Sequence, residues 1–127
     1  MRKKDRSTSS LQYSKTGLVI DSIQDKKGED IVVLNLEHIP DTASNQFIIC
    51  QADSTTQVRA IANNIIDRLD DEMNEVPYSK EGLDRCEWVL VDYIDTVIHI
   101  FTKEKRNFYQ LEDLWHDAVM EAIPNIN

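Results

Sequence analysis

The chain has 127 residues, of which 41 % are hydrophobic and 29 % charged. This length and composition are typical of one globular domain, which we expect to span residues 1–127. No apolar run is long enough to span a membrane, and the first residues lack the apolar stretch of a signal peptide, so we expect a cytoplasmic protein without membrane contact. Of the net charge of −9, residues 1–27 contribute +4 (seven basic, three acidic) and residues 28–127 contribute −13 (seven basic, twenty acidic), which disfavours direct nucleic-acid binding and favours a basic protein partner.

The N-terminal half is predicted to form one helix and two strands. Residues 1–6 are expected to be a flexible basic N-terminus. A helix is predicted over 7–27, with Gly28 as its C-cap, because apolar side chains recur at helical spacing before that glycine. Short strands are predicted at 30–36 and 46–52, where apolar runs are bounded by turn-forming residues.

A second helix is predicted after the second strand. Ser54 and Gln57 have the spacing of a capping box. The residues that follow form one apolar face: Val58, Ile61, Ala62, Ile65, Ile66 and Leu69. A loop containing Pro77 and Gly82 comes next. Because a strand, a helix and further strands succeed one another, we expect a parallel neighbour for the preceding strand and a mixed sheet.

Residues 88–101, WVLVDYIDTVIHIF, are predicted to form a hairpin with Ile94 and Asp95 as its two-residue turn. Alternation of side chains then gives the hairpin two different faces. The first is almost purely apolar and is expected to be core: Val89, Val91, Tyr93, Thr96, Ile98 and Ile100. The second is aromatic and polar and is expected to be partly open: Trp88, Leu90, Asp92, Val97, His99 and Phe101.

A third helix is predicted from Asn107 to Ile123. Asn107 and Gln110 have capping spacing, and Pro124 would end the helix. Its apolar stripe, in which Trp115 is expected to be core, consists of Leu111, Leu114, Trp115, Ala118, Val119, Ala122 and Ile123.

The best candidate for catalytic residues is Asp92 with His99, which lie diagonally across the hairpin on one face. No serine, cysteine or lysine of either strand shares that face, so a structural Asp–His pair is a serious alternative and catalysis is disfavoured. No metal or cofactor is expected, because ligand spacing and glycine-rich loops are absent. Cys50 and Cys86 are expected to be buried thiols. Aromatic residues beside charges, as at Trp88, are typical of a protein-binding patch.

The chain resembles the ribosome silencing factor family, also called Iojap-like proteins, in both halves: Val32-Val33-Leu34 and Phe47-Ile48-Ile49 look like the family's first half, and Trp88 to Trp115 like its second. The resemblance covers roughly residues 10–118. Its specific part is the hairpin followed by a Tyr-x-Leu-Glu-x-Leu-Trp segment that starts at Tyr109. The chain departs from the family pattern at four positions: Asn35, Asn45, Gln46 and Ile94, the last of which stands where a glycine is usual.

This resemblance implies a mixed α/β fold, similar to nucleotidyltransferases but without their catalytic motif, and a protein that is not an enzyme. It implies binding to the large ribosomal subunit through its protein number fourteen, which blocks joining of the small subunit and lowers translation when nutrients are scarce. A large-subunit assembly factor and a degenerate nucleotidyltransferase remain alternatives, and the free protein could form a homodimer. The expected partner-binding residues are Trp88, Asp92, Asp95, His99, Phe101, Arg106, Tyr109 and Glu112.

Overall fold

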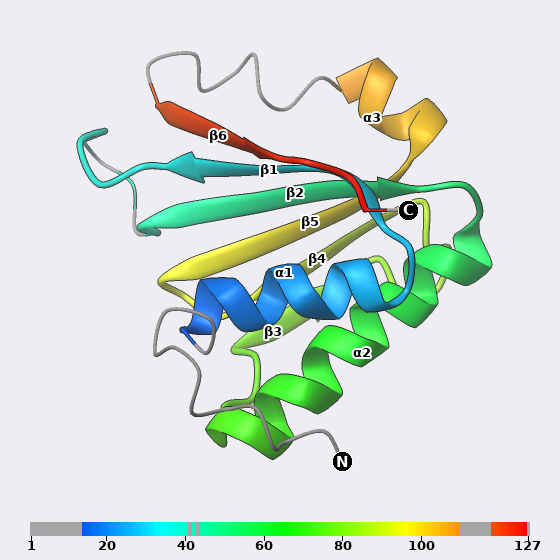
Figure 1. Cartoon of the computed structure of the whole chain (residues 1–127), viewed down its shortest axis with the longest axis horizontal. Helices are drawn as coiled ribbons and strands as arrows, with labels where there is room; N and C mark the ends of the chain where they lie inside the picture. The colour runs from blue at the N-terminus through cyan, green and yellow to red at the C-terminus, as the bar shows by residue number, and fades with distance from the viewer. Residues whose placement is uncertain (1–13, 41, 43, 110–117, 127) are drawn as a thin grey trace.

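The computed structural model describes residues 14–40, 42, 44–109 and 118–126. These residues form a six-stranded sheet, in the order β3-β4-β5-β2-β1-β6, with helices beside it (Figure 1). Along the chain the elements are α1 (Lys15–Asp25), β1 (Glu29–Asn35), β2 (Gln46–Ala52), α2 (Thr55–Met73), β3 (Ser79–Glu81), β4 (Trp88–Asp92), β5 (Thr96–Thr102), α3 (Lys103–Tyr109) and β6 (Val119–Ile123). The predicted α/β class is confirmed.

The sheet is mixed, as predicted. Strand β2 pairs in parallel with β5, while its other neighbour, β1, is antiparallel. The hairpin strands β4 and β5 are antiparallel, so the parallel partner of β2 is the second strand of the hairpin. The short edge strand β3 was not predicted, because its three residues, SKE, carry no apolar pattern.

Helix α1 is shorter than predicted at both ends. Ser14 has an extended backbone, and its Oγ accepts a hydrogen bond from the Gly17 N–H at 3.0 Å, so Ser14 is the N-cap. The part of the predicted helix before Ser14 lies outside the described residues. At the other end Lys27, with φ 66°, holds the left-handed position predicted for Gly28. Gly28 is required for a different reason, since a Cβ there would overlap the Cγ2 methyl group of the buried Ile23.

Helix α2 begins where the capping box predicts. The Ser54 Oγ accepts from the Gln57 N–H at 3.1 Å, and the Gln57 side chain in turn accepts from the Asp53 N–H at 3.0 Å. The helix ends at Met73, and its C-cap is Asn74, whose backbone is left-handed with φ 57°. Within the described part of the chain, no helix combines the length and the apolar character needed to cross a membrane.

Helices α1 and α2 lie side by side over one face of the sheet (Figure 1). They bury an aliphatic core that includes Ile23 of α1, Ile61 of α2 and Ile98 of β5, all fully inaccessible to solvent. Cys50 and Cys86 are buried free thiols, as predicted, and burial raises the pKa of Cys50 to about 12. A second, smaller cluster of buried side chains lies on the opposite face: Leu34, Leu36, Ile49 and Phe101.

The prediction of one helix from Asn107 to Ile123 is wrong. Helix α3 begins earlier, at Lys103, and Val119–Ile123 form strand β6, which pairs antiparallel with the edge of β1. The backbone groups of β1 on that side need hydrogen-bond partners, and the backbone of Val119–Ile123 supplies them. Long-range pairing therefore overrides the helical spacing of the apolar residues at this end of the chain.

Candidate protein-binding site

The hairpin has the predicted register. Val89 pairs with Ile100 and Val91 with Ile98, and both pairs are fully buried beneath the helices. On the opposite face Trp88 pairs with Phe101. The division of the hairpin into an aliphatic face and an aromatic, polar face is therefore confirmed.

The turn of the hairpin uses the carboxylate of Asp92. Ile94 has φ 75°, and its N–H donates to Asp92 Oδ1 at 2.7 Å. Because Asp92 is engaged at the turn, the expected Asp92–His99 pair is not formed. The Asp92 side chain instead orders the backbone that leads into β5.

His99 is paired with Trp88. The Trp88 indole N–H donates to His99 Nδ1 at 3.1 Å, which leaves the proton of the neutral ring on Nε2. The ring is only 4 % exposed, and Nε2 is buried without a hydrogen-bond partner. Burial lowers the pKa of His99 to about 4, so the imidazole is neutral near pH 7. It therefore orients the indole and cannot act there as a cation.

Four rings surround this hydrogen bond and form an aromatic cluster: Phe47, Trp88, His99 and Phe101. The Trp88 and Phe101 rings are stacked, with their centroids 5.0 Å apart and their planes at 24° to each other. The ring centroids of Phe47 and His99 are 4.8 Å apart. Phe101 is fully buried, whereas Trp88 is partly exposed, as predicted. The face is partly open, as expected, at Trp88, Leu90 and Asp92, whereas Val97, His99 and Phe101 are buried. Of the aromatic cluster, only the outer members, Trp88 and Phe47, reach solvent.

Trp88 also lines a shallow groove of about 170 Å³ between the β3–β4 connection and α3. Side chains of both charges line this groove: Asp84 and Glu87 are acidic, and Arg85 and Lys105 are basic. The groove gives the indole an open side where an apolar group of a partner could pack against it.

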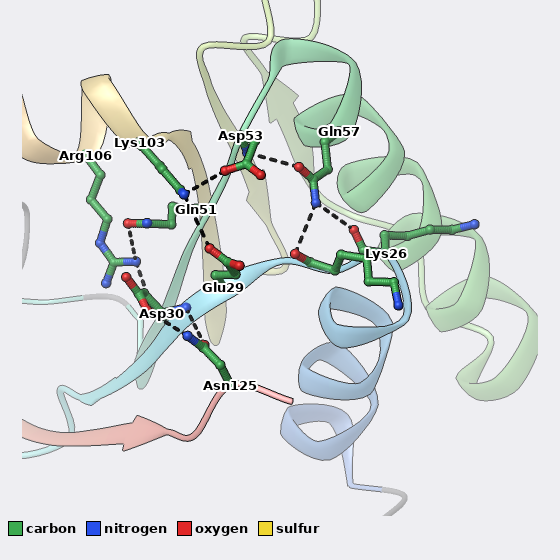
Figure 2. Close-up of polar contacts among 10 residues, drawn as sticks. Lys26, Glu29, Asp30, Gln51, Asp53, Gln57, Lys103, Arg106 and Asn125 are labelled. Atoms are coloured by element: carbon green, nitrogen blue, oxygen red, sulfur yellow. Dashed lines mark hydrogen bonds and ion pairs between the residues drawn. The ribbon is translucent and has the colours of Figure 1, made fainter. Parts of the chain in front are cut away.

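Arg106 is almost completely buried and is held by contacts within the fold. Only 8 % exposed, it donates to the Asp30 carbonyl and to Gln51 Oε1 (Figure 2). Asn125 also contacts Asp30, donating to its carboxylate and accepting from its N–H. Nearby, Lys103 Nζ lies 2.7 Å from the Asp53 carboxylate (Figure 2). This network joins α3 and the tail after β6 to the irregular start of β1, where Asp30 has φ 52°.

Asp95 lies on the other side of the hairpin end, away from the aromatic cluster. Its carboxylate accepts from Lys15 Nζ at 2.8 Å, and Lys15 makes a second 2.8 Å ion pair with Glu75. Asp95 borders a polar cavity of about 470 Å³, which Asp92 does not line. The two aspartates therefore do not converge on a common site. Among the residues that the structure describes, no group of three or more His, Cys, Asp or Glu could hold a metal ion.

Two predicted partner-binding residues cannot be placed. Glu112 lies outside the described residues, as does Trp115, and Tyr109 is the last residue of α3 but its side chain is not among those described. Sequence reasoning in turn missed Phe47 and Lys105. The alternation of β2 and its register with β5 put Phe47 beside the aromatic cluster, but that register is a long-range feature.

The chain matches known proteins over most of its length. A family model described as "Ribosomal silencing factor during starvation" matches residues 9–127. The ribosomal silencing factor RsfS of Bacillus subtilis (strain 168) is 45 % identical over 94 residues, which cover 74 % of this chain and 78 % of that protein. A more distant relative from Mus musculus, named "Mitochondrial assembly of ribosomal large subunit protein 1", is 28 % identical over 101 residues, 77 % of this chain and 43 % of that protein. The crystal structure of a Chromobacterium violaceum protein superposes with a TM-score of 0.75 at 33 % identity, covering 80 % of this chain and 83 % of that one.

Proposed function

Because the chain belongs to the ribosomal silencing factor family, we propose that it represses translation by binding the large ribosomal subunit and blocking the small subunit from joining. The contact would be with a basic protein of the large subunit, number fourteen in the standard series, and repression would set in when nutrients are scarce. The protein would act in the cytoplasm, and its free form could be a homodimer.

The observation that supports this proposal most directly is that Trp88 is fixed in place and yet partly exposed. Its indole is held by His99 and stacked on Phe101, yet one side of it faces an open groove. A large aromatic side chain that is fixed in place but partly exposed is the usual anchor of a protein interface, because little conformational freedom is lost when it binds. Trp88 is thus the centre of the proposed contact.

The other predicted contact residues differ in the part that they would play. His99, Phe101 and Arg106 are buried and would contribute indirectly. His99 and Phe101 would hold Trp88 in place, and Arg106 would hold α3 against the start of β1.

Asp92, which is partly exposed at the end of β4, would contribute at the rim, where an acidic side chain would complement a basic partner. Tyr109 and Glu112 stay predicted contacts, whereas Asp95 pairs with Lys15 away from Trp88 and is left out of this contact. Residues 28–127 together carry a net charge of −13, which also favours a basic partner.

The proposed activity is steric and needs no catalysis. A phosphoryl- or nucleotidyl-transferring site would require carboxylates that share a metal site, with ions about 4 Å apart in the two-metal case. Asp92 instead closes a turn and Asp95 pairs with Lys15. This division supports a regulatory binding protein over a degenerate nucleotidyltransferase.

Assembly of the large subunit is the second candidate function. It is favoured by the name of the mouse relative, which refers to assembly of the mitochondrial large subunit. Both functions would use the same surface, at different stages in the life of the subunit.

Co-sedimentation with purified large subunits, followed by addition of small subunits, tests the proposal. We expect the protein to sediment with large subunits and to reduce the fraction of joined ribosomes. Binding should weaken as salt rises, since exposed charge pairs are screened over about 10 Å at 0.1 M. Sedimentation with mature subunits and undiminished joining would contradict silencing, and binding only to immature particles would support assembly instead.

A further inference from the structure

Exposed apolar side chains gather at the turn end of the hairpin, away from Trp88. Val76 is 69 %, Tyr78 75 % and Ile94 55 % exposed. Their segments are joined through Asp92, whose carbonyl accepts from the Tyr78 N–H at 2.7 Å and whose carboxylate accepts from the Ile94 N–H. Residues from the α2–β3 connection and from the β4–β5 turn therefore form one edge of the molecule.

Ile94 is an unusual choice for this position. Its φ of 75° lies in the left-handed region, which is unfavourable for β-branched residues and which a glycine would adopt without strain. The side chain is also more than half exposed, so its burial does not compensate for the strain. A strained and exposed apolar residue lowers stability, and strain of this kind is concentrated at functional sites.

The polar cavity beside Asp95 opens next to this edge. Lys15 bridges the carboxylates of Glu75 and Asp95, which are the chain neighbours of Val76 and Ile94. Glu37 is a third carboxylate in the wall, and the remaining lining consists of hydroxyl and amide side chains: Thr16, Asn35, Asn45, Gln46 and Thr96. With three carboxylates and one ammonium group, the cavity of about 470 Å³ has an excess of negative charge.

The two features occur at the same end of the fold. Figure 1 shows α1 beginning, α2 ending and β5 beginning at the left of the view, while α3 and the C-terminus lie toward the right. The groove beside Trp88 is bordered by Lys105 of α3, and the cavity by Lys15 of α1. This end is thus a surface separate from the one proposed to bind the ribosome.

We propose that Val76, Tyr78, Ile94 and the adjoining cavity form a docking surface, called here the turn-end surface, for a basic segment of a partner protein. A lysine or arginine side chain of that segment enters the cavity, where the excess carboxylate charge and the amide oxygens bind it. An apolar side chain next to it packs on Ile94 and Tyr78. The net negative charge of residues 28–127 disfavours an acidic segment as the occupant.

A titration followed by amide NMR shifts tests this inference independently of ribosome binding. The probe is a short peptide of alternating lysine and leucine, and a glutamate–leucine peptide is the control. We expect the lysine peptide to produce its largest shifts at Glu75, Val76, Tyr78, Ile94 and Asp95, and the glutamate peptide to produce none there.

Two variants separate docking from stability. Ile94→Gly removes the side chain and the strain together, so it should weaken peptide binding about tenfold while raising the melting temperature. Val119→Ser, at a residue 65 % exposed on the far edge strand β6, is the matched control and should bind the peptide normally.

Three results would overturn the inference. The first is a titration in which the lysine peptide does not bind at the turn-end surface. Such a titration would show no shifts, shifts spread evenly over the acidic surface, or shifts centred on Trp88. Another is unchanged peptide affinity in Ile94→Gly. The third is a dimer, detected by analytical ultracentrifugation, that Ile94→Gly dissociates, which would assign the turn-end surface to a second copy of the chain.

Discussion

The two faces of the β4–β5 hairpin are made by alternate residues of the same strands, yet they differ in composition and in cover. The face beneath α1 and α2 is aliphatic, and Val89, Val91 and Ile98 are fully buried. The opposite face has a buried inner layer, His99 and Phe101, under a partly exposed Trp88. The first face holds the fold together, while the second is layered so that buried rings support an accessible one.

The largest expected difference between the faces concerns a new charge. Val91→Asp places an unpaired carboxylate in the aliphatic core and should unfold the protein, because such a charge costs several kcal/mol. Leu90→Asp, the adjacent and partly exposed position on the other face, should remain folded. Far-ultraviolet circular dichroism on heating measures both. An unfolded Leu90→Asp together with a folded Val91→Asp would reverse the assignment of the faces.

The inner layer of the second face should behave like core. Phe101→Ala removes a fully buried ring and should lower the free energy of unfolding by about 3–5 kcal/mol. Urea denaturation measures this loss, with Phe101→Leu as the milder control. A loss below about 1 kcal/mol, within the usual range of surface substitutions, would show that this layer does not support the face.

The pH dependence of stability tests the burial of His99. Its pKa in the folded protein is about 4, against an ordinary value of 6.5. Between these pH values the unfolded chain binds a proton that the folded chain does not. The contribution of neutral His99 is therefore complete above pH 6.5 and is lost as the pH falls toward 4, by roughly 3 kcal/mol in total.

His99→Gln should lack this loss. Urea denaturation of the wild type and the variant at pH 7.5 and pH 5 isolates the effect from that of the carboxylates, which both proteins share. The wild type should lose about 2 kcal/mol more than the variant over this interval. Equal losses would mean that His99 takes up a proton in the folded state as readily as in the unfolded state.

The sequence predicts the hairpin well because its register depends on local alternation and a two-residue turn. The same reasoning did not show which part of the second face is covered, since Phe101 is buried by residues of β1 and β2 that are distant in the chain. It failed for Val119–Ile123 for a related reason. Helical spacing is a local signal, whereas the open edge of β1 that recruits this segment is not.

The candidate site was predicted only in part. Trp88 is partly exposed as expected, because an aromatic residue that alternates with core residues must lie on the other face. The role of Asp92 was missed, because its carboxylate accepts a hydrogen bond from the Ile94 N–H in the turn and does not pair with His99. The burial of Arg106 was also missed, because its partners at Asp30 and Gln51 depend on the position of α3 relative to the sheet.

The large-subunit binding of Trp88→Ala, measured together with its stability, tests the central claim most directly. Because Trp88 is only partly buried, the variant should lose about 1–2 kcal/mol of unfolding free energy, less than Phe101→Ala, and remain folded. Loss of co-sedimentation with large subunits by this folded variant is the predicted result. A Trp88→Ala protein that is folded and still co-sediments as strongly as the wild type would contradict the claim that the hairpin face is the ribosome-binding surface.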